Sequence, residues 1–143
     1  KPQIKKLLRV WDHISIFFLI GGSYTPIICK YTEPHTAAWF LTGMWSLIAL
    51  GSLLKIFFTG KYDRVSTAVY IILGWMVVLV IKPIMANMPS DIFSWIVAGG
   101  CCYTFGVIFY KWQNLTFQHS IWHVFVLAGT LLHFIGIYKC IGV

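Results

Sequence analysis

The stretch FQHSIWHVFVLAGTLLHFIGI, residues 117–137, is a long apolar segment that nevertheless carries three histidines. It contains no Lys, Arg, Asp or Glu, and an apolar run of about 18 residues or more predicts a transmembrane helix. A histidine inside a bilayer is costly unless it faces a polar group. His119, His123 and His133 are therefore candidate functional residues.

The rest of the chain has the same character. Of its 143 residues, 59% are hydrophobic and only 10% are charged. Five stretches without Lys, Arg, Asp or Glu, at 13–29, 36–54, 65–81, 92–110 and 112–138, have 17, 19, 17, 19 and 27 residues, where the second is counted from His35. Turn-forming, charged segments separate them. We predict an all-α integral membrane protein, a single membrane domain over residues 1–143 with a bundle of five transmembrane helices at about 12–29, 36–55, 65–82, 92–110 and 119–139.

The net charge of +7 is explained by membrane topology rather than by nucleic-acid binding. Cytoplasmic loops are enriched in Lys and Arg. With residues 1–10 inside, eight basic residues lie inside and three outside. The inside set is Lys1, Lys5, Lys6, Arg9, Lys55, Lys61, Arg64 and Lys111, and the outside set is Lys30, Lys82 and Lys139. We expect a multi-pass plasma-membrane protein with a cytoplasmic Lys1 end, an outside C-terminus and membrane lipids as partners.

The first and fifth predicted spans run in the same direction, so they begin at the same membrane face. Asp12 begins the first, and His119 and His123 begin the fifth. Positions i and i+4 lie on one helix face, where two imidazoles can share one divalent metal. Asp12 can supply an oxygen or hold a water molecule. Zinc takes about four ligands, and a third nitrogen is missing unless His13 turns inward.

Simpler interpretations remain open for these residues. The histidine pair can be a surface pair or a satisfied core pair, and Asp12 can sit at a helix N-terminus or pair with Arg9. His133 follows His119 by 14 residues, roughly 21 Å along a helix, which is too deep to share a metal. It fits a buried hydrogen-bond donor to another helix better than a haem ligand, because the opposing histidines would have to be His13 and His35, which lie 22 residues apart on either side of the first span.

Small residues and Pro26 predict local packing. Gly21, Gly22, Gly99, Gly100 and Gly106 are expected to allow close helix approach. Pro26 is expected to bend or end the first span, with its freed carbonyl re-satisfied by Ser23, Tyr24 or Thr25.

The segments WDHISIFFLIGGSYTPI (residues 11–27) and FQHSIWHVFVLAGTLLHF (residues 117–134) resemble the two signature regions of the haemolysin III family. That family is related to the adiponectin and progestin receptors and, more distantly, to the alkaline ceramidases. YIILGWMVV and GGCCYTFGVIFY are supporting stretches. The similarity covers nearly the whole chain.

The resemblance implies a seven-helix membrane bundle with a cytoplasmic N-terminus, of which this chain would hold helices three to seven. It further implies a zinc ion near the cytoplasmic side. His119 and His123 match the two zinc ligands of helix seven, and Asp12 matches the aspartate that contacts the metal-bound water. The remaining ligand, a histidine of helix two, would precede Lys1.

Three functions are compatible with this pattern. The first is a zinc-dependent hydrolase that acts on amide or ester bonds of a membrane lipid, with Asp12 as the general base; the ceramidase kinship points to a lipid amidohydrolase. The second is a membrane-permeabilising haemolysin, although no span carries a polar stripe that would line a pore. The third is a non-catalytic receptor or sensor. The sequence does not fix the oligomeric state.

Overall fold

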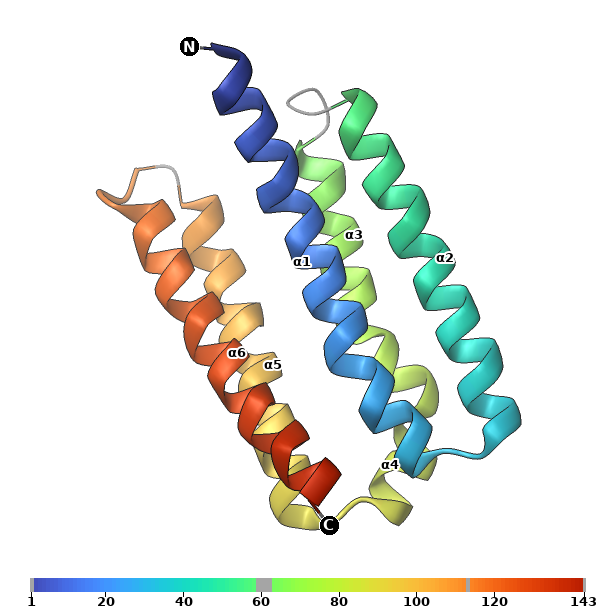
Figure 1. Ribbon diagram of the computed structural model, residues 1–143. Coiled ribbons are helices and arrows are strands. Elements are labelled where there is room, and N and C mark those ends of the chain that lie inside the picture. Colours follow the sequence, from blue (N-terminus) through green and yellow to red (C-terminus); the bar gives the residue numbers. More distant parts are fainter. Residues whose placement is uncertain (1, 59–62, 113, 143) are drawn as a thin grey trace. The chain divides into compact units, whose positions relative to one another are not determined.

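The computed structural model describes residues 2–58, 63–112 and 114–142, and within them every regular element is helical. The elements, shown in Figure 1, are α1 (Pro2–Tyr31), α2 (Pro34–Phe58), α3 (Asp63–Trp75), the 3-10 helix η1 (Met76–Val80), α4 (Ile81–Asn87), α5 (Ser90–Lys111) and α6 (Gln118–Gly142). The prediction of an all-α fold is confirmed.

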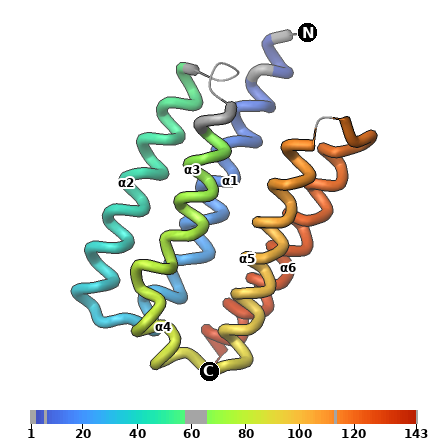
Figure 2. The backbone as a smooth tube through the Cα atoms, turned by 180° about the vertical axis from the view of Figure 1, so that it is seen from behind, coloured from blue at the N-terminus to red at the C-terminus, as the bar shows by residue number. Residues whose placement is uncertain are grey.

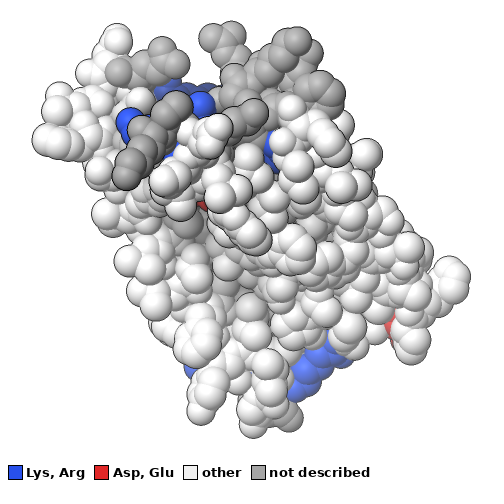
Figure 3. All heavy atoms as spheres, turned by 45° about the horizontal axis from the view of Figure 1, so that its top comes forward, with Lys and Arg blue, Asp and Glu red and all other residues white. Residues whose placement is uncertain are grey.

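Five helical stretches in the described residues are long and apolar enough to cross a membrane, which confirms the five predicted spans. They are Gln3–Tyr31, Pro34–Phe57, Ser66–Asn87, Ser90–Lys111 and Gln118–Gly142. On the face shown in Figure 3, the described Lys, Arg, Asp and Glu residues form small groups among other residues. The orientation in the membrane stays a prediction, and four residues of its inside set lie outside the described side chains: Lys1, Lys6, Lys61 and Arg64.

The first helix is longer than predicted. Counting from the last charged residue placed its start near residue 12, but α1 begins at Pro2. The reason is that a charge makes a helical turn unfavourable in lipid, not in water, so the basic segment continues the same helix beyond the apolar part. Asp12 consequently lies well inside α1, and the interpretation of Asp12 as a helix N-terminal residue is wrong.

The chain forms two compact units, Lys1–Ile84 and Met85–Val143. The first contains α1, α2, α3 and η1, the second contains α5 and α6, and the boundary between them falls within α4. The prediction of one membrane domain over residues 1–143 stays a prediction.

In the first unit, α1 and α2 form an antiparallel pair, and α3 lies beside them (Figures 1 and 2). Glycine allows the two helices to approach closely. A Cβ at Gly21 of α1 would lie 2.8 Å from Ile48 Cδ1, and a Cβ at Gly51 of α2 would lie 2.6 Å from Phe17 Cζ. For Gly22, by contrast, no described residue has an atom within 4 Å of an added Cβ. The expectation of close approach is therefore confirmed for Gly21, whereas no described residue approaches Gly22 in this way.

Pro26 lies inside α1, which continues to Tyr31, so the expectation that it ends the span is wrong. Proline leaves the carbonyl four residues earlier, that of Gly22, without its helical donor. The neighbouring hydroxyls do not bond to that carbonyl: Ser23 Oγ donates to the Leu19 carbonyl and Thr25 Oγ1 to the Gly21 carbonyl, each at 2.7 Å. The prediction that they re-satisfy it is wrong.

The third span is interrupted near its middle. Its α-helix ends at Trp75, and the next five residues form η1. Pro83 explains the interruption in part, because its ring cannot donate a hydrogen bond and crowds the carbonyl of Leu79 in η1. Tyr24 of α1 bonds into the break: its hydroxyl donates to the Gly74 carbonyl and accepts from the Val77 N–H at 3.1 Å.

In the second unit, α5 and α6 form an antiparallel hairpin in which glycines face large side chains. A Cβ at Gly99 would overlap the His133 ring at Cδ2, and one at Gly129 would lie 2.9 Å from Tyr103 Cε1. Gly106 faces Phe125 in the same manner. The expectation of close approach is confirmed for Gly99 and Gly106.

At Gly100, in contrast, the described part of the chain places no atom within 4 Å of an added Cβ, so the same expectation has no support there. Phe117, the last residue before α6, has a positive φ of 61°, which turns the chain into that helix.

Candidate metal centre

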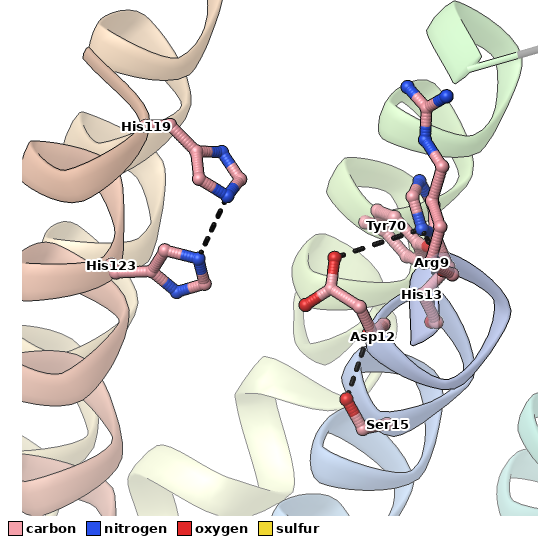
Figure 4. A network of polar contacts seen from close by, with 7 residues as sticks. All are labelled: Arg9, Asp12, His13, Ser15, Tyr70, His119 and His123. Carbon is pink, nitrogen blue, oxygen red and sulfur yellow. Dashed lines mark hydrogen bonds and ion pairs between the residues drawn. The ribbon is translucent and has the colours of Figure 1, made fainter. Parts of the chain in front are cut away.

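His119 and His123 lie in the first two turns of α6 and point at each other (Figure 4). Their Nε2 atoms are 3.0 Å apart, and the ring centroids are 4.5 Å apart with the planes nearly perpendicular. The helix itself produces this meeting, because residues four apart lie on the same face. Without a metal the two rings share one N–H···N hydrogen bond, in which one ring donates and the other accepts.

The pair also has the geometry of two ligands to one zinc ion. Two nitrogens bound at 2.0–2.1 Å to a tetrahedral zinc are about 3.3 Å apart, close to the observed 3.0 Å. Both rings would then carry their proton on Nδ1 and offer the Nε2 lone pair. Within the described residues no group of three or more His, Cys, Asp or Glu side chains could hold a metal. The pair alone can thus occupy two of the about four coordination positions of a zinc ion.

Aromatic rings border the histidine pair. The indole of Trp122 lies 5.3 Å from the His119 ring and 4.6 Å from the His123 ring, centroid to centroid. On its other side Trp122 contacts Tyr110 of α5, at 5.1 Å. Trp122 was not among the residues predicted to serve the site. Its position three residues after His119 and directly before His123 was the signal that it would lie beside both rings.

Asp12 lies in the first unit, on α1. Its side chain is 43% exposed, and it forms an ion-pair contact with His13, with 3.8 Å between Oδ2 and Nδ1. Ser15 donates to the backbone carbonyl of Asp12 and not to its carboxylate (Figure 4). The carboxylate is therefore accessible for accepting a proton. A site shared by Asp12 and the histidine pair stays a prediction.

His13 of α1 is buried, and its ring centroid lies 6.5 Å from that of Tyr70 in α3. Its Nδ1–H donates to the Arg9 carbonyl at 2.7 Å, and its own carbonyl accepts a hydrogen bond from the Tyr70 hydroxyl at 3.0 Å. The ring thus turns toward α3 within the first unit, with one nitrogen already bonded to the backbone.

His133 is a donor to another helix, as predicted. Its Nε2–H donates to the Ile96 carbonyl of α5 at 3.0 Å. The ring stands edge-on to Tyr103, with 5.2 Å between centroids. Because Nε2 is bonded and the ring is enclosed by Gly99 and Tyr103, His133 fixes the hairpin and has no part in the pair at the start of α6.

Comparison with known proteins identifies relatives over almost the entire chain. The family model described as "Haemolysin-III related" matches residues 1–134. "Hemolysin-3" of Bacillus cereus is 39% identical over 133 residues, which are 93% of this chain and 61% of that protein. "Hemolysin-3 homolog" of Bacillus subtilis (strain 168) is 36% identical over 142 residues, or 99% of this chain and 67% of that protein.

A human protein is more distantly similar. "Monocyte to macrophage differentiation factor" of Homo sapiens is 28% identical over 137 residues, which are 95% of this chain and 56% of that protein. The chain thus spans between about half and two thirds of the length of these relatives. No solved structure gives a significant match.

Proposed function

The chain belongs to the haemolysin-III related family of multi-pass membrane proteins, and we propose that it is the larger part of a zinc-dependent hydrolase that cleaves amide or ester bonds of membrane lipids. The observation that carries this proposal is the 3.0 Å separation of the His119 and His123 Nε2 atoms at the start of a membrane-spanning helix. A polar pair in such a helix is costly unless it serves a function.

His119 and His123 would hold the metal, together with a histidine that precedes Lys1 in the full-length protein. That third ligand is part of the proposal and rests on the family resemblance and on the length of the relatives, which exceeds that of this chain. When bound, zinc supplies a Lewis acid that polarises a carbonyl and activates water near neutral pH.

The part of Asp12 in this scheme is that of a general base. A carboxylate that is 43% exposed can receive the proton of an attacking water and pass it to the leaving amine or alkoxide. In the predicted topology the first and fifth spans begin at the same membrane face, which would bring Asp12 to the depth of the pair. The apolar exterior of the spans suits the acyl chains of a lipid substrate that enters from the bilayer.

The test is made on the full-length protein purified in lipid nanodiscs. We expect about one zinc per chain, lost in the double variant His119→Ala, His123→Ala, and release of fatty acid from a ceramide or a glycerolipid ester. Asp12→Asn should keep the zinc and lose about 100-fold or more in turnover, as expected for removal of a general base. Stoichiometric zinc without any lipid turnover would contradict the hydrolase and favour a structural or sensing site.

A second function, membrane permeabilisation, is favoured by the names of two relatives, "Hemolysin-3" and "Hemolysin-3 homolog". It makes a different prediction. Leakage of a small dye from liposomes would persist in the His119→Ala, His123→Ala variant if permeabilisation is direct. If it follows from altered lipids, leakage and fatty-acid release would disappear together.

A further inference from the structure

The imidazoles of His119 and His123 need a support that the helix backbone does not provide. Both residues are exposed, and an exposed imidazole on a helix samples several rotamers. Holding two Nε2 atoms 3.0 Å apart therefore costs side-chain entropy that neighbouring contacts must offset. In the described residues, the ring that contacts both imidazoles is Trp122.

Trp122 contacts the two rings in different ways because of its place on the helix. It follows His119 by three residues, so its indole lies over the His119 ring at an interplanar angle of 35°. It directly precedes His123, whose ring meets the indole at 53° and 4.6 Å. The single indole thus lies against both imidazoles while their Nε2 atoms face each other.

The indole is in turn fixed by α5. Its ring packs against Tyr110, 5.1 Å away between centroids. A Cβ at Gly106 would lie 3.5 Å from Trp122 Cδ1, which means that the indole rests against α5 where that helix has no side chain. Trp122 is half-buried there. A continuous path of contacts therefore runs from α5 through the indole to both histidines.

We propose that Trp122 is a positioning residue, held by Gly106 and Tyr110, that pre-organises His119 and His123 for one metal ion. This inference deepens the proposed function and rests on it for the metal, but the arrangement of the rings is a property of the metal-free protein as well. Partners that orient metal ligands are worth about 10- to 100-fold in metal affinity.

The first experiment needs no metal. Nuclear magnetic resonance of histidine-labelled full-length protein in nanodiscs detects the N–H···N bond between the two rings by its nitrogen–nitrogen scalar coupling. We expect the coupling in the wild type and in Trp122→Phe, which keeps an aromatic ring, and its loss in Trp122→Leu. Trp39→Leu is the matched control: Trp39 is an exposed tryptophan of α2, in the other unit, and its replacement should keep the coupling.

The second experiment measures zinc affinity of the same four proteins by competition with a chelating dye. Trp122→Leu should weaken binding by about tenfold or more, whereas Trp122→Phe and Trp39→Leu stay within about threefold of the wild type. Thermal melting separates loss of positioning from loss of fold. Should Trp122→Leu unfold, Gly106→Ala replaces it, because the added Cβ lies 3.0 Å from Phe125 Cβ and moves the α6 face away from α5.

The outcomes separate this inference from the proposed function. One outcome is that the wild type binds no zinc, while Trp122→Leu loses the ring coupling that the wild type shows. This outcome contradicts the metal site and supports the positioning role. A folded Trp122→Leu protein that keeps both the coupling and the zinc affinity overturns the positioning role and leaves the metal site standing.

Discussion

In the α5–α6 hairpin, His133 and Tyr103 bond between two continuous helices, whereas in the first unit Tyr24 bonds into a helix that is interrupted at η1 (Met76–Val80). The backbone of the hairpin is complete without those side chains, since each helix satisfies its own peptide groups. In the third span, the tyrosine hydroxyl replaces a helical partner that the backbone has lost. Polar side chains therefore link two intact helices in the second unit, whereas in the first unit a tyrosine hydroxyl bonds to backbone groups at a helix interruption.

This difference predicts unequal costs on removal. A side-chain hydrogen bond between two helices whose backbone groups are already paired contributes little in a membrane, about 0.6 kcal/mol on average. At a helix interruption whose backbone groups bond to a side chain, removal of that side chain leaves peptide groups without a partner, and the lipid supplies no water to replace it. Substitution of a closely packed glycine is expected to cost the most, because a methyl group that meets a ring cannot be accommodated without moving a helix.

The largest effect is expected for Gly99→Ala. The new methyl would overlap the His133 ring and would lie 3.1 Å from the Gly129 carbonyl oxygen, so the ring must move and lose its bond to Ile96. We expect a loss of about 2–4 kcal/mol in the free energy of unfolding, from overpacking and a lost hydrogen bond. Unfolding in mixed detergent micelles measures it.

Gly100→Ala is the matched control, one residue further along α5, where a Cβ meets nothing within 4 Å. It should change stability by less than about 0.5 kcal/mol. Equal effects of the two substitutions would contradict the close packing of α5 against α6 at Gly99.

The second effect is expected for Tyr24→Phe, which removes one hydroxyl and keeps the ring. The Gly74 carbonyl and the Val77 N–H both lose a partner inside an apolar span. We expect a cost of about 2 kcal/mol, the usual penalty for orphaned buried polar groups. Hydrogen exchange gives a local readout: the Val77 amide should exchange faster in the variant. An unchanged exchange rate would mean that the Val77 N–H does not depend on the Tyr24 hydroxyl as its hydrogen-bond acceptor.

The smallest effect is expected for Tyr103→Phe. Thr130 already donates its proton to the Val126 carbonyl at 2.8 Å, so the Tyr103 hydroxyl is the donor in the 3.0 Å contact between the two side chains. Removing it orphans no backbone group, and the expected cost is about 0.6 kcal/mol. A cost as large as that of Tyr24→Phe would contradict the expected difference between a bond that links two intact helices and a bond at a helix interruption. The same detergent titration compares the two variants directly.

The sequence predicts those features that depend on local geometry. The five spans follow from the spacing of charges, and the facing of His119 and His123 follows from their separation by four residues. The donor role of His133 follows from the cost of a lone polar group in lipid. Each of these conclusions needs only the residues of one helix and its solvent.

Features that depend on a second helix were missed or mispredicted. Gly21 and Gly22 are adjacent glycines in the sequence, yet among the described residues a neighbouring helix packs against Gly21 and not against Gly22. Tyr24 was expected to serve its own helix near Pro26 and instead bonds to the third span, 50 residues away. The role of Trp122 was missed because its contacts to Tyr110 and Gly106 come from α5.

The central claim is that His119 and His123 bind one metal together. Zinc K-edge X-ray absorption of the full-length protein tests it most directly, since it reports the donors around the ion. We predict about one zinc per chain with two or more imidazole nitrogens at about 2.0–2.1 Å, and loss of that signal in His119→Ala. Absence of stoichiometric zinc, or zinc that keeps its full imidazole shell after His119→Ala, would contradict the claim.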